Sequence, residues 1–279
     1  MKLAVGFFDG VHRGHQAILS GADAALTFSN HPLSVLCPER APVLVMDTEE
    51  KVAAIRACGV KDVFVLDFTR ELAGEEPEAF VDSVCSLCGV TRSALSVRCG
   101  ANWRFGKGGA GDAAYLRTLG IPVEVLPYAE HLGEAISSTR VRRALEAGDL
   151  ESVRAMLGRP YAVSGKVVVG KGIGRALGFP TVNVQPACRP ESVRLPLGVY
   201  VVEAKGVRAV ANFGLAPTMG DRAWRQPTWE LHFLQDVPDM PSEGCLRFEA
   251  LRHLRPERTF ASLEELQRQI ALDRAEALR

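Results

Sequence analysis

The sequence has no apolar run that approaches the roughly 18 residues a helix needs to cross the hydrocarbon core of a bilayer. It also shows no signal peptide, no low-complexity tract and no internal repeat. These absences favour a globular protein without a membrane partner.

A surplus of one charge is missing as well. The chain carries 33 basic and 33 acidic residues, so bulk charge does not favour a nucleic-acid partner or an anionic membrane surface. The charge balance differs along the chain. The part up to Leu157 has 16 basic and 20 acidic residues, and the part after it has 17 basic and 13 acidic residues. Because 279 residues exceed one average domain, we predict two domains, 1–157 and 158–279, and no obligatory protein partner.

Cysteines are few and irregularly spaced. Their number is seven, which is odd, and this favours reduced thiols in a cytoplasmic protein over a disulfide framework. Cys85 and Cys88 form a Cys-x-x-Cys pair inside a helical pattern, but no second pair completes a zinc site. We therefore predict that both are buried thiols.

A glycine-rich turn near the start of the chain is the first feature that indicates chemistry. Residues 5–15 read Val-Gly-Phe-Phe-Asp-Gly-Val-His-Arg-Gly-His, a strand end followed by a turn and the beginning of a helix. Backbone N–H groups in such a turn approach a phosphate closely, and His12 and His15 add two donors on the same side. Taken alone, His-x-Gly-His is equally compatible with surface histidines or a partial metal site.

Short apolar strands alternate with helices in the first half. The predicted strands are Leu3–Val5, Ala24–Phe28, Asp62–Leu66, Leu95–Val97 and Pro122–Leu126, and the predicted helices run from Asp47 or Thr48 to Cys58, from Pro77 to Gly89, and from Ser138 continuously to Leu157. This α/β pattern predicts a mainly parallel sheet with helices on both faces and ligands beyond the carboxyl ends of the strands.

The second half has a different pattern. Five strands rich in β-branched and aromatic residues follow one another without helices between them, at Val163–Val169, Gly198–Glu203, Val207–Phe213, Thr228–Phe233 and Cys245–Leu251. They indicate an antiparallel barrel or sandwich, of which we adopt the barrel. A capping box from Ser262 to Glu265 predicts a terminal helix.

In this context His-x-Gly-His after Gly-x-Phe-Asp-Gly resembles the nucleotidyltransferase superfamily, specifically the adenylyltransferase half of bacterial bifunctional riboflavin kinase/FAD synthetases. The resemblance implies a Rossmann-like domain in which His12 and His15 stabilise charge on the α-phosphate of ATP. Three later segments, within 27–32, 100–107 and 136–142, match further elements of that family. The nucleotide-binding residues implied are Gly6, Phe8, Asp9, Gly10, His31, Asn102, Ser138, Thr139 and Arg142. We interpret Trp103 and Phe105 as loop anchors rather than flavin-stacking residues.

A stretch at residues 170–183 closely resembles the riboflavin kinase signature Gly-Arg-x-Leu-Gly-Phe-Pro-Thr-x-Asn. By this resemblance Thr181 and Asn183 engage nucleotide phosphates and Mg²⁺, a hard cation that takes oxygen ligands. The glycine-rich segment covers the phosphates with Gly170, Lys171, Gly174 and Arg175, and the flavin contacts are Phe179 and Arg255. Pairing of Arg255 with a surface carboxylate is an equally good interpretation.

Glu230 occupies a strand position at which a carboxylate usually has no special role. By resemblance it is the base that accepts the proton of the riboflavin 5′-hydroxyl as that oxygen attacks the γ-phosphate. The resemblance thus implies an enzyme that phosphorylates riboflavin to FMN and adenylylates FMN to FAD, with ATP, Mg²⁺ and flavin as its ligands. The alternatives are a riboflavin kinase with a degenerate first half, and a non-catalytic flavin- or nucleotide-binding regulator.

The crossover between His15 and Thr27 is short. A parallel crossover with its helix needs on the order of a dozen residues, and the family typically uses about twice the space seen here. We predict a truncated or irregular helix, a loosened phosphate-binding edge and FAD synthesis slower than FMN synthesis.

Overall fold

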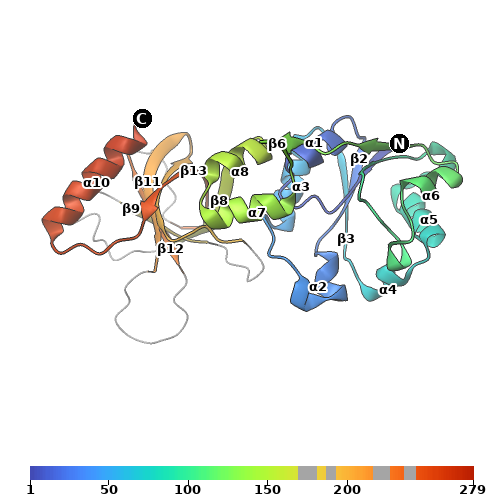
Figure 1. Cartoon of the computed structure of the whole chain (residues 1–279), viewed down its shortest axis with the longest axis horizontal. Coiled ribbons are helices and arrows are strands. Elements are labelled where there is room, and N and C mark those ends of the chain that lie inside the picture. Colours follow the sequence, from blue (N-terminus) through green and yellow to red (C-terminus); the bar gives the residue numbers. More distant parts are fainter. Residues whose placement is uncertain (169–180, 187–192, 216–226, 236–242) are drawn as a thin grey trace. The chain divides into compact units, whose positions relative to one another are not determined.

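The computed structural model describes residues 1–168, 181–186, 193–215, 227–235 and 243–279 (Figure 1). They form two compact units. Met1–Arg142 makes up most of the first, and the described residues from Arg143 onward make up nearly all of the second. The functional boundary after Leu157 stays a prediction. Within the described residues no helix is long and apolar enough to cross a membrane.

The first unit is built on a five-stranded parallel sheet with the order β3-β2-β1-β4-β5. Its strands are β1 (Lys2–Val5), β2 (Ala24–Phe28), β3 (Asp62–Leu66), β4 (Ser96–Gly100) and β5 (Val123–Leu126). The chain moves outward from β1 to β3 and then returns to β4 on the other side of β1. The predicted parallel sheet is confirmed, and its strand order reverses between β1 and β4, where ligands of such sheets bind.

Helices cover both faces of this sheet. They are α1 (Arg13–Leu19), α2 (Pro32–Leu36), α3 (Thr48–Ala57), α4 (Arg70–Gly74), α5 (Pro77–Cys88) and α6 (Ala113–Thr118), with short 3₁₀ turns at 38–40, 92–94 and 107–109. Leu3 and Val5 share a core with Phe80 of α5, whereas Ala4 faces the opposite core with Ile55 of α3. Figure 1 shows α5 and α6 on one side of the sheet and α1 and α3 on the other.

The ends of two predicted helices agree with their sequence signals. Asp47 caps α3 by accepting the Glu50 N–H, and Gly89 ends α5 in the left-handed conformation with φ 65°. Cys85 is buried and Cys88 is half-buried, and the cysteines that the structure describes are free thiols. The short helices α2, α4 and α6 were not predicted, because five or six residues show too little periodicity.

The predicted truncated helix is confirmed, because α1 has only seven residues. The predicted loosening of the adjacent edge is wrong. Phe8, Val11, Ile18 and Leu19 all lie in one core, and none exposes more than 8% of its surface. Two turns therefore suffice to pack this edge.

Arg98 of β4 secures the other end of this short helix. Its side chain is 11% exposed, and its guanidinium donates to the carbonyl of Ser20 and, at 3.2 Å, to that of Ala17. These oxygens belong to the last turn of α1, where helices have carbonyls without partners and favour positive charge. A buried arginine from the neighbouring strand thus caps α1.

The connection between the units contains two helices, α7 (Ser138–Ala147) and α8 (Leu150–Leu157), so the prediction of one continuous helix is wrong. Gly148 breaks it with φ 72°, and a Cβ there would lie 2.9 Å from His253 Nδ1. The apolar pattern continues across the break because Leu145 and Leu150 are both buried.

The second unit is a closed barrel with the strand order β10-β11-β12-β9-β8-β13, which confirms the barrel over the sandwich. Its strands are β8 (Tyr161–Val168), β9 (Thr181–Pro186), β10 (Gly198–Ala204), β11 (Val207–Gly214), β12 (Thr228–Phe233) and β13 (Cys245–Pro256). The terminal helix α10 (Leu263–Ala277) belongs to the same unit. The small hairpin of β6 (Glu130–His131) and β7 (Glu134–Ala135) belongs to the first unit. Strand β9 was not predicted as a strand.

Aromatic side chains fill the barrel. Trp229 stacks on Phe213 at 4.5 Å between ring centroids and meets Phe248 edge-on at 5.2 Å. Since strand residues alternate between faces, the neighbours of Trp229 on β12 point outward. Val201 and Val210 are outward-facing residues in a small core that includes Ala277 of α10.

Candidate active sites

A strained loop joins β1 to α1. Phe8, Gly10 and Val11 all have positive φ, at 54°, 81° and 40°. Such values are rare for a bulky or β-branched residue, and strain of this kind persists where the surroundings over-determine the backbone. Phe8 and Val11 are fully buried, and Thr27 donates its hydroxyl to the Phe7 carbonyl at 2.9 Å.

The two histidines of the motif lie together at the start of α1. His12 is the N-cap and its Nδ1 accepts the His15 N–H at 3.3 Å. The two rings stack at 3.6 Å between centroids, and Phe8 meets the His15 ring edge-on at 5.4 Å. Gly14 gives the rings room, since a Cβ there would lie 3.2 Å from His12 Cε1.

Burial keeps His15 neutral. It lowers the pKa of His15 well below the ordinary value of 6.5, with smaller contributions from His12 and Lys51. At neutral pH the His15 imidazole therefore carries one N–H donor and no charge. Such a donor can bond a phosphate oxygen without first losing a proton.

Asp9 connects the loop to α7. It is 3% exposed, and its Oδ1 accepts the Val45 N–H at 2.9 Å. The Nε of Arg142 lies 3.6 Å from its Oδ2, and Ser138 donates its hydroxyl to the Asp9 carbonyl at 2.9 Å. Burial raises the pKa of Asp9, while the Val45 N–H and Arg142 act in the opposite direction. The predicted Ser138 and Arg142 are thus beside the loop, at the first turns of α7 with Thr139.

His31 follows β2 at the same sheet edge. It caps α2 by accepting the Leu33 N–H at 3.1 Å, and its ring meets Phe7 edge-on at 4.9 Å. Its pKa is lowered by burial and then by the charges of Arg142 and Lys51. Of the other predicted residues, Asn102 is exposed on the loop after β4.

Lys51 of α3 was missed by the sequence analysis. It is 3% exposed, its Nζ donates to the Phe28 carbonyl at 2.5 Å, and it lies 4.1 Å from the centroid of the Phe7 ring. Burial lowers its pKa to about 8, partly offset by Asp9. Its spacing of four residues from the buried Ile55 places both on one helix face, which is the signal that could have found it.

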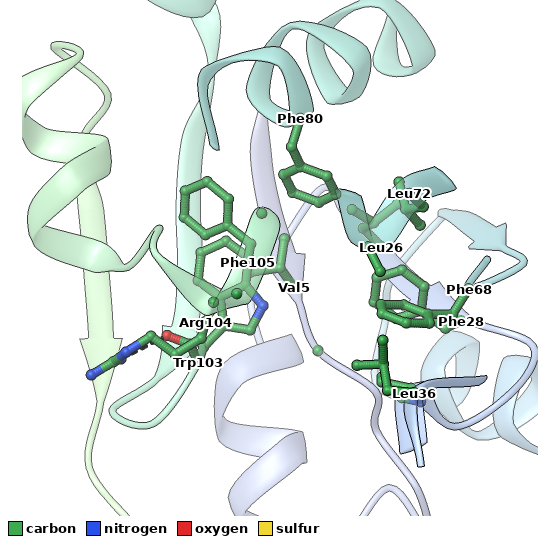
Figure 2. A pocket seen from close by; sticks show the side chains of 16 residues that line it. Val5, Leu26, Phe28, Leu36, Phe68, Leu72, Phe80, Trp103, Arg104 and Phe105 are labelled. Atoms are coloured by element: carbon green, nitrogen blue, oxygen red, sulfur yellow. Dashed lines mark hydrogen bonds between the residues drawn. The ribbon is translucent and has the colours of Figure 1, made fainter. Parts of the chain in front are cut away.

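An apolar cavity of about 310 Å³ adjoins the loop. Figure 2 shows Trp103 and Phe105 on one side of it and Phe28, Phe68 and Leu36 on the other. The Trp103 and Phe105 rings stack at 4.7 Å. Phe105 is a buried anchor, as predicted, but Trp103 also lines the cavity and is only partly covered.

The barrel brings a second set of polar residues together. Glu230 of β12 lies directly opposite Asn183 of β9 on one side and Asn212 of β11 on the other. Since Trp229 points into the barrel, these three residues lie on its outer face. Thr181 lies two residues before Asn183 on the same face, and Asn212 was not predicted as a site residue.

Five predicted residues, Gly170, Lys171, Gly174, Arg175 and Phe179, lie outside the described residues. Among those that are described, no cluster of three or more histidine, cysteine or acidic side chains forms a metal site. Thr181 and Asn183 nevertheless offer hydroxyl and amide oxygens, and Mg²⁺ takes oxygen ligands. Their chemistry fits the predicted ion.

Comparison with known proteins identifies the family. Residues 1–140 match the family described as FAD synthetase, and residues 157–279 match the family described as riboflavin kinase. The bifunctional riboflavin kinase/FMN adenylyltransferase of Escherichia coli K12 is 33% identical, over 97% of this chain and 90% of its own length. The chain belongs to the bifunctional riboflavin kinase/FMN adenylyltransferase family.

Other members of this family are similar to the same extent. The enzyme of that name from Pseudomonas fluorescens is 34% identical, over 98% of this chain and 90% of its own length. The enzyme from Bacillus subtilis is 30% identical, over 99% of this chain and 91% of its own length. A solved structure, titled a macrolide-efflux protein from Streptococcus pneumoniae, has a TM-score of 0.86 and covers 100% of this chain and 93% of its own. At 24% identity it supports the fold alone.

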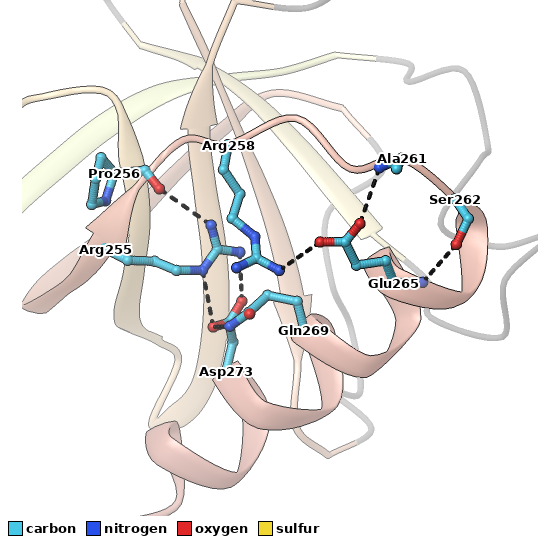
Figure 3. A network of polar contacts seen from close by, with 8 residues as sticks. All are labelled: Arg255, Pro256, Arg258, Ala261, Ser262, Glu265, Gln269 and Asp273. Carbon is cyan, nitrogen blue, oxygen red and sulfur yellow. Dashed lines mark hydrogen bonds and ion pairs between the residues drawn. The ribbon is translucent and has the colours of Figure 1, made fainter.

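Arg255, a predicted flavin ligand, forms an ion pair with the terminal helix. Its Nε and Nη2 donate to the two carboxylate oxygens of Asp273 at 3.1 and 2.8 Å (Figure 3). Gln269 donates to the same carboxylate at 2.8 Å, and Asp273 is 6% exposed. The carboxylate-pairing interpretation is therefore confirmed, with a buried partner in place of a surface one. A flavin contact by Arg255 stays a prediction.

Proposed function

We propose that the first unit transfers AMP from ATP to the phosphate of FMN, and that the barrel transfers the γ-phosphoryl group of ATP to riboflavin. The family supports both activities, with ATP and flavin as substrates. The observation that supports the first most strongly is the stacked histidine pair beside the loop that follows β1, in which burial keeps His15 neutral.

In the adenylyl transfer, a phosphate oxygen of FMN attacks the α-phosphorus of ATP. The bond from that phosphorus to the oxygen bridging the α- and β-phosphates breaks, and pyrophosphate leaves. His12 and His15 donate N–H bonds to the α-phosphate oxygens, on which negative charge increases. Donors held in place before the reaction stabilise such charge without reorganisation.

The apolar cavity is the site we propose for the flavin ring. Its volume of about 310 Å³ and its aromatic lining suit a flat, largely apolar ligand. Trp103 and Phe105 then form one wall against which the ring lies, in place of the purely structural role that the sequence suggested. The exposed Asn102 next to them is proposed to contact nucleotide.

The triphosphate of ATP is proposed to lie at the start of α7. Ser138, Thr139 and Arg142 occupy the first turns of this ten-residue helix, and Arg142 is charge-paired with Asp9. Helix N-termini favour anions, and a guanidinium adds a charge-assisted donor. Gly6 and Gly10 let the loop backbone approach the phosphates from the opposite side.

In the barrel, Glu230 accepts the proton of the riboflavin 5′-hydroxyl while that oxygen attacks the γ-phosphorus and ADP leaves. Thr181 and Asn183 would hold Mg²⁺, which when bound neutralises phosphate charge. Asn212, directly across from Glu230 on β11, donates its amide to Glu257 at 3.4 Å. The predicted phosphate and flavin contacts of Gly170, Lys171, Gly174, Arg175 and Phe179 remain part of this proposal.

One experiment separates the proposed function from its alternatives. The purified protein is incubated with riboflavin, ATP and Mg²⁺, and the flavins are separated by chromatography. FMN and FAD support two activities, FMN alone supports a kinase with a degenerate first unit, and unchanged riboflavin supports a binding protein. A parallel reaction with EDTA should yield neither product if Mg²⁺ is required.

A further inference from the structure

Lys51 has an unusual environment for a lysine. The side chain is 3% exposed, and within the described part of the chain its one hydrogen bond goes to the Phe28 carbonyl at 2.5 Å. An ammonium group has three N–H donors, so this bond leaves capacity for a further acceptor. Burying a charge is costly, and proteins do so where the charge is paired or used.

The ammonium lies between the two halves of the proposed adenylyltransferase site. Phe28, to which it is bonded, lines the apolar cavity, as does Gly6. The Phe7 ring beneath it belongs to the loop that leads to the histidines, and the Lys51 charge influences the pKa of His15. Lys51 is therefore at the junction between the cavity for the flavin and the place where the α-phosphate reacts.

We propose that Lys51 binds the phosphate of FMN, the group that attacks ATP in the adenylyl transfer. This inference rests on the proposed function of the first unit and names the residue that recognises its nucleophile. The phosphate ends the ribityl chain of FMN, so a flavin ring in the cavity directs it toward the junction where Lys51 lies. Lys51 holds it there by charge and takes no proton from it.

A second cation makes this assignment specific. Arg142 lies on α7 near Asp9, at the helix start proposed for the triphosphate. Lys51 lies on α3, and its link to the cavity is its bond to the carbonyl of Phe28, a lining residue. Asp9 interacts with both charges. Two cations on separate elements suit two separate phosphate groups, Arg142 for ATP and Lys51 for FMN.

The charge of Lys51 should be visible in the pH dependence. Its pKa of about 8 means that the ammonium loses its proton in an accessible range. Asp9, His15 and His31 face it. The pKa of Asp9 is raised from the ordinary 3.8, and the pKa values of His15 and His31 are lowered from the ordinary 6.5, so both histidines are neutral above pH 7. Arg142 keeps its charge. A change in the affinity for FMN near pH 8 therefore reports the charge of Lys51.

The test is steady-state FAD formation from FMN and ATP by the full chain, with Lys51→Met compared with wild type. Met keeps the length and apolar character of the side chain and removes the charge. We expect KM for FMN to rise roughly 10- to 100-fold, the loss typical of one charge-assisted hydrogen bond. KM for ATP should change less than about twofold, and the riboflavin kinase activity should not change. Lys61→Met, at an exposed lysine of the same unit, is the matched control.

Three results would overturn the inference. The first is an unchanged KM for FMN in Lys51→Met. The second is a KM for ATP that rises in this variant as much as its KM for FMN. The third is a KM for FMN of the wild-type protein that does not increase above pH 8. If Lys51→Met does not fold, Lys51→Arg replaces it and should retain FMN affinity within about tenfold at pH 9, where wild type has lost it. No FAD from wild type or from Lys61→Met would instead refute the proposed function itself.

Discussion

Glu230 gives the sharpest separation of the two activities. Glu230→Gln keeps the shape of the side chain but removes the group that accepts a proton, and a missing general base costs about 10²- to 10⁴-fold in rate. We expect FMN formation from riboflavin to fall by this amount, while FAD formation from added FMN stays within about twofold. The measurement is chromatography of the two reactions with one enzyme preparation. Unchanged FMN production would remove Glu230 from the mechanism.

The histidine pair should show the converse behaviour. In His12→Ala or His15→Ala one donor to the α-phosphate is lost, which should cost roughly 3 kcal/mol, or about a hundredfold in kcat for FAD formation. Riboflavin phosphorylation should continue at the wild-type rate. Because the rings stack on each other, thermal unfolding of each variant must be compared with wild type. Both variants forming FAD at full rate would show that the histidines are structural.

Local chemistry explains which site residues could be predicted. His12 and Asp9 lie in one short glycine-rich turn between a strand and a helix, so the pattern is visible in the sequence. Lys51 could not be predicted in the same way, because it stands beside two glutamates and resembles a solvated helix position. Only the packing of α3 against the sheet buries it, and that contact involves residues far apart in the chain.

The short helix α1 depends on Arg98 for its position. Arg98→Met removes a charged donor from the carbonyls of Ala17 and Ser20, which should lower the free energy of unfolding by roughly 1–3 kcal/mol. Since the histidines begin the same helix, we also expect kcat for FAD formation to fall about tenfold or more at temperatures where the variant is folded. Arg56→Met, at an exposed arginine of α3, is the control. A variant with wild-type thermal stability and activity would show that α1 needs no such cap.

Several elements show where a sequence pattern reaches its limit. The strands of the sheet and helices α3 and α5 were predicted because their caps and apolar runs are local signals. The interruption at Gly148 was not, because an apolar pattern that continues from Leu145 to Leu150 cannot reveal that His253 occupies the space beside the glycine. Strand β9 was missed for a similar reason, since Thr181–Pro186 forms a strand by pairing with β12 and β8.

The chain as a whole should behave as two independent catalysts. The described residues proposed for each activity lie within one unit, and each unit has its own core. A mixture of Glu230→Gln and His12→Ala should therefore convert riboflavin to FAD, because FMN released by one variant is a substrate for the other. Each variant alone should stop at riboflavin or at FMN. No FAD from the mixture, with both single activities intact, would show that FMN must pass within one molecule.

Strand β1 also determines when the adenylyltransferase site can form while the ribosome is making the chain. It is central in its sheet, and its two neighbours are made at very different times, β2 soon after it and β4 only from Ser96 onward. A nascent chain that has not reached β4 leaves one edge of β1 without partners, a template for mispairing that chaperones recognise. Once the first turns of α7 are made, the adenylyltransferase site can form while the barrel is still unmade, since the barrel closes only when β13 pairs with β8. The activity that acts second in FAD synthesis is thus the one that a ribosome finishes first.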